Sequence, residues 1–324
     1  MEVCGRRKES AGQEEKMKKF DHSLLKDPRY FCDGRMEAHS DHIYYRSEEE
    51  REDEETSFRK SLNGLWKFHY ARNYASAISG FEKESYSCKD WEDIYVPAHI
   101  QMEGYDVPQY ANVQYPWEGH EELHPGQIPE RFNPVASYVK YFHVPESMKG
   151  KRVFISFQGA ESGIALWLNG GFVGYSEDSF TPSEFELTEY LKDGENKLAA
   201  QVFKWTSSSW CEDQDFYRFS GIYRDVYLFT VPEVHVYDLR IRAIPDETLK
   251  RAELEVVTKA WGKGTMKLAL SRKGQVILED QKLLDGETAY TWEIEAPVLW
   301  SAEDPALYDL ELKVYDENGT LQEI

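Results

Sequence analysis

The sequence predicts an all-β protein built from two antiparallel domains, and three observations lead to this prediction. Apolar and polar residues alternate with a period of two, as at Val153, Ile155 and Phe157, which is the pattern of a half-buried strand. Turn residues such as Asn169-Gly170-Gly171 separate these runs, as hairpins require. The length of 324 residues suits two domains of ordinary size, each with its own core.

The first domain begins near residue 56, where a turn at Asn63-Gly64 precedes alternating aromatic residues. Residues 164–168 and 172–175 are expected to form the hairpin around Asn169-Gly170-Gly171. A short helix is expected over residues 182–191, where Asp193-Gly194 would close it. Two further strands, over residues 197–205 and 222–231, complete this domain.

The second domain follows Val231-Pro232-Glu233 and contains short strands separated by turns. Residues 254–258 and 268–270 are expected to be two of these strands, and Lys273-Gly274 is expected to be a turn. Strands at this spacing over roughly 90 residues are typical of an immunoglobulin-like sandwich. A final turn at residues 316–319 leads into a strand that has just begun at Ile324, so we expect the chain to be part of a longer protein.

These boundaries give an N-terminal extension and connecting segment (1–55), a first β domain (56–232) and an immunoglobulin-like domain (233–324). The connecting segment contains an acidic run over residues 48–55, which we interpret as solvated. His39 and His42 lie three residues apart, but no third metal ligand is near them in the sequence. We therefore expect a packed segment there rather than a metal site.

Composition excludes several classes of partner. The formal net charge of −21 disfavours nucleic acid and anionic membranes, and no apolar run reaches 18 residues. The first twenty residues lack the apolar core of a secretory signal, which favours a cytoplasmic protein. The four cysteines form no CxxC pair, so we expect free thiols, although an even number also permits disulfides.

A loop over residues 206–215 is the first candidate binding site. Glu212, Asp213 and Asp215 place three carboxylates within four residues, after a polar segment at the end of a strand. Carboxylates accept hydrogen bonds from sugar hydroxyls, and loops on a rigid β scaffold commonly bind ligands. The spacing differs from that of a calcium loop. Neighbouring acids on one short loop seldom face each other as a glycosidase pair must, so sugar binding or a structural acidic loop is the better interpretation.

Asn112 is a second candidate, because an amide can both donate hydrogen bonds to a sugar hydroxyl and accept them from it. Taken alone this signal is weak, since an Asn near a Pro often makes a turn. The sequence shows no phosphate-binding glycine loop, no G-x-S-x-G and no HExxH.

The segments around these residues resemble glycoside hydrolase family 2, and specifically the large β-galactosidases of the LacZ type. The resemblance runs from about Asp33 to the end of the chain. The matching segments are residues 38–40 (AHS), 62–68 (LNGLWKF), 96–102 (VPAHIQM), 110–116 (YANVQYP), 167–170 (WLNG), 174–179 (GYSEDS), 212–226 (EDQDFYRFSGIYRDV), 297–301 (PVLWS) and 305–308 (PALY). Residues 1–32 match no part of the family pattern.

The resemblance implies a jelly-roll, galactose-binding-like sandwich, then the immunoglobulin-like sandwich, then a (β/α)₈ barrel that these residues do not include. Both catalytic glutamates and the magnesium ligands would lie in that barrel, so we expect no catalytic residue here and no activity from this chain alone. Asn112 and Val113 match the loop that reaches galactose. Asp215 matches an acid that binds galactose and, in the complete enzyme only, sodium.

The function implied is one wall of the galactose site in a retaining β-galactosidase, an enzyme that hydrolyses terminal β-D-galactosides such as lactose. The expected partners are a β-galactoside, the barrel domain and further copies of the same protein, with neither nucleic acid nor membrane. A stand-alone carbohydrate-binding sandwich is one alternative. A structural or adhesive β-sandwich without a sugar site is a second, which the ordered sugar-loop segments disfavour.

Overall fold

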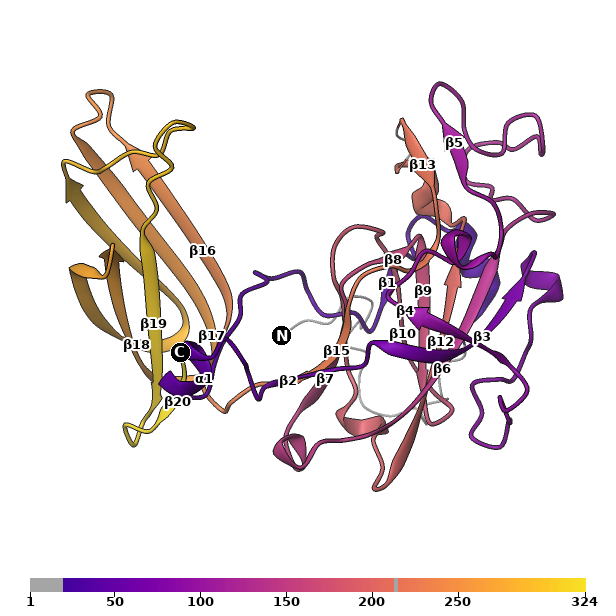
Figure 1. Cartoon of the computed structure of the whole chain (residues 1–324), viewed down its shortest axis with the longest axis horizontal. Helices are drawn as coiled ribbons and strands as arrows, with labels where there is room; N and C mark the ends of the chain where they lie inside the picture. Colours follow the sequence, from indigo (N-terminus) through magenta and orange to yellow (C-terminus); the bar gives the residue numbers. More distant parts are fainter. Residues whose placement is uncertain (1–19, 213–214) are drawn as a thin grey trace. The chain divides into compact units, whose positions relative to one another are not determined.

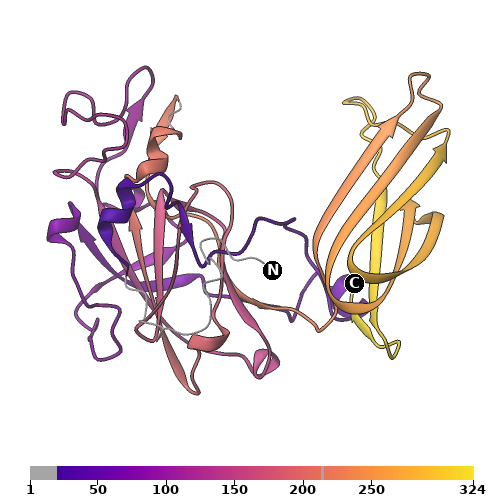
Figure 2. The same ribbon diagram turned by 180° about the vertical axis from the view of Figure 1, so that it is seen from behind.

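The computed structural model describes residues 20–212 and 215–324, and these residues form two β units (Figures 1 and 2). The first unit comprises residues 20–37 together with Arg59–Thr230, and the second comprises Ala38–Phe58 and Val231–Ile324. Each unit has its own hydrophobic core. The expected all-β architecture with two sandwiches is confirmed.

Two sheets face each other in the first unit. The larger has seven strands in the order β1-β10-β9-β12-β6-β3-β4, the smaller has four in the order β11-β7-β15-β2, and β13-β5 and β14-β8 are separate ribbons. The strands are β1 (Cys32–Asp33), β2 (Arg59–Ser61), β3 (Gly64–Ala71), β4 (Glu92–Val96), β5 (Gln109–Ala111), β6 (Val135–His143), β7 (Val153–Phe157), β8 (Ala160–Glu161), β9 (Gly163–Leu168), β10 (Gly171–Glu177), β11 (Ser183–Glu186), β12 (Glu195–Phe203), β13 (Phe216–Arg218), β14 (Gly221–Ile222) and β15 (Val226–Thr230).

The core between these sheets is built by large side chains at alternate strand positions. Trp66 and Phe68 of β3 are buried, as are Ile155 and Phe157 of β7. All five residues of β7 are buried, because this strand lies inside its sheet between β11 and β15. The alternating residues Val153, Ile155 and Phe157 lie in the core between the sheets, but Phe154 and Ser156 are buried too, so the expected half-buried strand is buried on both faces.

The predicted hairpin is present. Strands β9 and β10 pair with Leu168 opposite Gly171, and the two turn residues Asn169 and Gly170 have φ of 52° and 84°. Asn and Gly tolerate this left-handed conformation, so the local sequence specifies the turn.

The helix expected over residues 182–191 is wrong. Strand β11 occupies Ser183–Glu186 and pairs with β7, and only a 3₁₀ turn follows at Thr188–Tyr190. Phe185 is completely buried in the core. The physical reason is tertiary, because pairing with β7 satisfies the backbone of this segment and buries Phe185, which outweighs local helix propensity.

The second unit is a five-stranded arrangement in the order β16-β17-β19-β20, with β18 also paired to β17. Its strands are β16 (His235–Pro245), β17 (Arg251–Arg272), β18 (Gln275–Glu295), β19 (Asp309–Asp316) and β20 (Leu321–Glu323). The two strands expected at residues 254–258 and 268–270 are one strand, β17, whose register shifts between Lys259 and Lys263. The expected turn at Lys273-Gly274 joins β17 to β18, with φ of 51° and 74°.

The segment Ala38–Phe58 packs on the second unit, which divides the expected extension of residues 1–55 between the two units. Tyr45 and Ile324 exchange two backbone hydrogen bonds of 3.0 and 2.9 Å. The carboxylate of Glu48 pairs with Lys313. The ring of His42 bonds to the carbonyl of Val236 at 3.0 Å and to the hydroxyl of Ser40 at 2.9 Å, so this histidine packs as expected.

The remaining elements are short. They are the helix α1 (Glu48–Glu52) and the 3₁₀ turns η1 (His22–Lys26), η2 (Tyr74–Ser76), η3 (Ile100–Glu103), η4 (Glu146–Met148), η5 (Thr188–Tyr190) and η6 (Ser207–Trp210). None of the helices in residues 20–212 and 215–324 is long and apolar enough to cross a bilayer. Cys88 and Cys211 are free thiols as expected, whereas Cys32 is disulfide-bonded, so the expectation fails for Cys32.

Candidate functional site

A two-stranded ribbon at one end of the first unit carries the predicted sugar-binding residues. Strands β5 and β13 pair antiparallel, with Tyr110 opposite Tyr217 and Ala111 opposite Phe216 (Figure 1). Asn112 and Asp215 are the next residues beyond the last pair, so they lie at the same open end of the ribbon. The fold therefore brings together two residues that lie 103 positions apart in the sequence.

The hydroxyl of Tyr110 links these two residues. Tyr110 Oη donates to Asp215 Oδ1 at 2.5 Å and accepts a longer bond of 3.4 Å from Asn112 Nδ2. The Asp215 carboxylate, by accepting this bond, raises the pKa of the Tyr110 phenol. All three side chains are exposed, so the linked polar groups of this ribbon are accessible to a ligand.

Val113 extends away from the ribbon and is 93 % exposed. The chain that follows it is anchored by an aromatic cluster. The Tyr115 and Trp117 rings stack with their centroids 5.2 Å apart. The Trp210 ring centroid lies 4.5 Å from that of Tyr115 and 4.8 Å from that of Trp117. Because Trp210 lies in the same loop as Asp215, this cluster joins the segment that carries Asn112 to the loop that carries Asp215.

A buried ion pair connects the end of β12 to the segment that leads into β5. Lys204 Nζ, just after β12, lies 2.6 Å from Asp106 Oδ2, and neither side chain is exposed to solvent. Gln101 donates to the same carboxylate oxygen at 2.8 Å and exchanges bonds of 3.1 and 3.0 Å with Ser220. This network fixes the segment before β5 and the segment after β13, and nothing in the local sequence pattern indicated it.

The three acids of the candidate loop have different environments. Glu212 accepts hydrogen bonds from the backbone and hydroxyl of Ser179 at 3.0 and 2.9 Å, and burial raises its pKa. This acid is therefore a structural anchor, whereas Asp215 is exposed. Asp213 lies outside the described residues.

Two more buried acids lie beneath this loop. Burial raises the pKa of Glu161 to about 8, and the charge of Glu212 adds to that shift. Glu177 accepts bonds from Tyr175 at 2.7 Å, from the Ser207 hydroxyl at 2.9 Å and from the Ser208 backbone at 2.8 Å. Burial raises the pKa of Glu177 as well. Glu177 therefore holds Ser207 and Ser208 of the loop, and both acids are buried from solvent.

The arrangement can bind a polar ligand through an acceptor carboxylate and an amide. Across residues 20–212 and 215–324, no group of three or more His, Cys, Asp or Glu side chains is placed to hold a metal ion. The exposed Asp215 carboxylate is an oxygen donor of the kind that hard cations prefer. Any such ion would need further ligands beyond this carboxylate.

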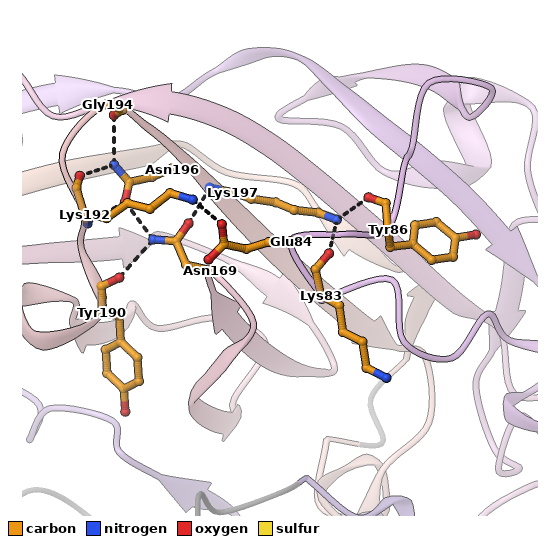
Figure 3. Close-up of polar contacts among 9 residues, drawn as sticks. All are labelled: Lys83, Glu84, Tyr86, Asn169, Tyr190, Lys192, Gly194, Asn196 and Lys197. Carbon is orange, nitrogen blue, oxygen red and sulfur yellow. Dashed lines mark hydrogen bonds and ion pairs between the residues drawn. The ribbon is translucent and has the colours of Figure 1, made fainter.

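Away from the ribbon, the first unit has a hollow of about 520 Å³ beside the β9–β10 hairpin. Figure 3 shows that its polar groups bond to one another. Asn169 donates to the Tyr190 carbonyl at 2.9 Å and to Asn196 Oδ1 at 2.8 Å, and it accepts from the Lys197 backbone at 2.9 Å. Lys197 Nζ donates to the carbonyls of Lys83 and Tyr86. These contacts secure the hairpin.

The structure resembles solved glycoside hydrolases in fold. It matches a β-glucuronidase of Bacteroides uniformis with a TM-score of 0.62 and 20 % identity, covering 82 % of this chain and 31 % of the other. It matches a glycosyl hydrolase family 2 member from Bacteroides cellulosilyticus with a TM-score of 0.60 and 22 % identity, covering 82 % and 35 %. At these identities the likeness concerns the fold alone.

Sequence relatives are closer. The chain is 50 % identical over 309 residues to a β-galactosidase of Halalkalibacterium halodurans, which is 93 % of this chain and 30 % of the relative. It is 44 % identical to a β-galactosidase of Streptococcus thermophilus, over 93 % and 30 % of the two lengths. It is 40 % identical to a β-galactosidase large subunit of Leuconostoc lactis, over 93 % and 50 %. The chain thus spans between about a third and a half of these relatives.

Models of the individual domains also match. Residues 59–232 match the sugar binding domain of the glycosyl hydrolases family 2, and residues 234–324 match a second domain of the same family. Since the two matches together cover nearly all of the chain after residue 58, the chain belongs to glycoside hydrolase family 2.

Proposed function

We propose that this chain is the N-terminal part of a retaining β-galactosidase and that it forms one wall of the galactose site. Asn112, Val113 and Asp215 would contact the sugar. The register of the β5–β13 ribbon supports this proposal, because it places Asn112 and Asp215 at the same open end with their polar groups accessible. The β-galactosidases that match over 93 % of the chain support the choice of a galactoside.

The chemistry of the reaction would reside elsewhere in the protein. A retaining glycosidase needs two carboxyl groups roughly 5 Å apart across the scissile bond. The acids near the ribbon are buried anchors, apart from Asp215, which we assign to binding. We therefore expect this chain alone to show no turnover, and we expect the catalytic glutamates and a magnesium ion in a barrel domain that follows Ile324.

Asp215 would also contribute one oxygen ligand to a sodium ion in the complete enzyme. Its exposed carboxylate fits that role, and the remaining ligands would come from the barrel. The natural partners would be the barrel domain and other copies of the same protein. Relatives named as large subunits of β-galactosidase support an assembly of more than one chain.

Reading the coding sequence beyond Ile324 tests the proposal most directly. A following (β/α)₈ pattern with two glutamates at strand ends is expected, and a stop codon would overturn the proposal. The decisive functional test is Asp215→Asn in the full-length protein. Its kcat/KM on an aryl β-galactoside should fall about 10- to 100-fold, because a hydrogen bond to a charged group is worth about 1.5–3 kcal/mol.

The matched control is Asp285→Asn, which changes an exposed acid of the second unit that pairs with Lys263. It should leave kcat/KM unchanged. Calorimetry of the isolated chain separates the proposal from a stand-alone carbohydrate-binding protein. Because the isolated chain would hold only part of the galactose site, it should bind galactose with a Kd of about 1 mM or weaker, which corresponds to a binding free energy of about −4 kcal/mol. Micromolar binding without turnover would favour the alternative.

A further inference from the structure

We propose that Tyr110 is a positioning residue of the galactose site, which orients Asp215 and Asn112 through its hydroxyl. This inference rests on the proposed function and adds a residue to it. Tyr110 itself is not required to touch the sugar. Its role would be to select one orientation of each of the two binding side chains.

The geometry of the ribbon puts Tyr110 in reach of both partners. Tyr110 and Tyr217 are paired and point to the same face of the ribbon, and Asn112 and Asp215, the first residues beyond β5 and β13, lie two positions from them along each chain. Asp215 lies on the diagonal from Tyr110, a separation that a long aromatic side chain spans. The two hydrogen bonds of the hydroxyl, 2.5 Å to Asp215 and 3.4 Å to Asn112, agree with this placement.

The chemistry of a phenol suits this bridging role. The Tyr110 hydroxyl has one proton to donate and lone pairs to accept with. It donates a hydrogen bond to Asp215 Oδ1. This bond fixes the orientation of the carboxylate and therefore the direction in which its second oxygen points. It accepts an N–H of Asn112, which directs the amide carbonyl away from Tyr110. One hydroxyl thus sets which acceptor atoms the site presents.

The ring of Tyr110 is itself held in place by the opposite strand. Its centroid lies 5.5 Å from that of Tyr217, its cross-strand neighbour, with the planes tilted by 53°. Aromatic pairs at this separation attract each other, so the ring keeps its position when the hydroxyl is removed. A Phe at position 110 is therefore expected to delete the two hydrogen bonds and to preserve the packing.

The test uses Tyr110→Phe, Asp215→Asn and the double variant in the full-length protein. Tyr110→Phe should raise both the KM for an aryl β-galactoside and the inhibition constant of galactose, each by about fivefold to tenfold. The hydrogen bond to the charged Asp215 carboxylate is lost, and solvent screening at this exposed position keeps the effect moderate. The control Tyr217→Phe should match wild type. All variants should melt within about 2 °C of wild type, since no buried group changes.

A double-mutant cycle distinguishes positioning from a general structural role. If Tyr110 acts through Asp215, then Tyr110→Phe should have little further effect in the Asp215→Asn background, and the two losses should be strongly non-additive. Additive losses, or a Tyr110→Phe variant with wild-type KM, would overturn the inference while leaving the proposed function intact. A fully active Asp215→Asn variant would instead overturn the proposed function.

Discussion

The ammonium of Lys204 lies 2.6 Å from the carboxylate of Asp106, and both side chains are fully shielded from solvent. Lys204 follows strand β12 of the large sheet, whereas Asp106 lies in the segment that leads into β5. The pair therefore connects the rigid core of the first unit to the ribbon that carries Asn112 and Asp215. A buried pair of this kind destabilises a protein strongly when only one partner is removed.

Replacing Lys204 by Met should lower the free energy of unfolding by about 3–5 kcal/mol, because it leaves the Asp106 carboxylate buried without its cation. The double variant Lys204→Met with Asp106→Leu should recover most of this loss. Urea unfolding followed by tryptophan fluorescence measures both. The exposed pair Lys263–Asp285 provides the control, and Lys263→Met should change stability by less than about 0.5 kcal/mol. A double variant as unstable as the single one would contradict the prediction.

The buried carboxyl of Glu161 should make the first unit less stable as the pH rises. Its pKa is raised from 4.5 to about 8 by burial, so the folded state keeps a proton that the unfolded state loses above pH 4.5. The stabilisation is complete below pH 4.5 and is lost as the pH rises through 8, on the order of a few kcal/mol in total.

Glu161→Gln removes this titration, so the stability of the variant should vary less between pH 5 and pH 8 than that of the wild type. Melting temperatures recorded across this range measure the difference. Glu195→Gln changes an exposed acid at the start of β12 and should retain the wild-type pH profile. Identical slopes for the wild type and Glu161→Gln would show that Glu161 is ionised in the folded protein.

Asn169 should contribute to stability in two separable ways. Its side chain makes three hydrogen bonds around the β9–β10 hairpin, and its φ of 52° is unfavourable for most residues (Figure 3). Asn169→Ala loses both contributions and should destabilise the first unit by about 2–4 kcal/mol. Asn169→Gly restores the backbone conformation and should recover about 1 kcal/mol of that loss. Equal melting temperatures for the two variants would contradict the backbone contribution.

Glu323 should anchor the last strand of the second unit. Its carboxylate accepts the Val236 backbone N–H at 2.7 Å and pairs with the His235 ring at 2.6 Å, in a buried position. Glu323→Ala leaves that N–H and ring without a partner, so it should cost about 2–3 kcal/mol. Glu317→Ala, at an exposed turn, is the control. Hydrogen exchange at Val236 measures the effect locally, and unchanged protection there would contradict the prediction.

Much of the fold could be predicted from residues that are neighbours in the sequence. The hairpin turns at Asn169-Gly170 and Lys273-Gly274 are specified locally, because Asn169 and the two glycines accept the left-handed backbone that such turns require. The alternation around Phe157 marked the face of β7 that lies in the core between the sheets, although the other face is buried as well. Where pairing partners decided the outcome, prediction failed, as at Ser183–Glu186, which is a strand because β7 lies beside it.

For the site, the sequence by itself determined which residue types are available, and the family resemblance predicted that Asn112, Val113 and Asp215 serve one sugar site. Only the tertiary structure brought Asn112 and Asp215 to the same end of the ribbon, put the Tyr110 hydroxyl between them and buried Lys204 with Asp106. The physical reason is that turn conformation depends on adjacent residues. Strand register and charge burial, by contrast, depend on contacts between segments about a hundred residues apart, which no local pattern encodes.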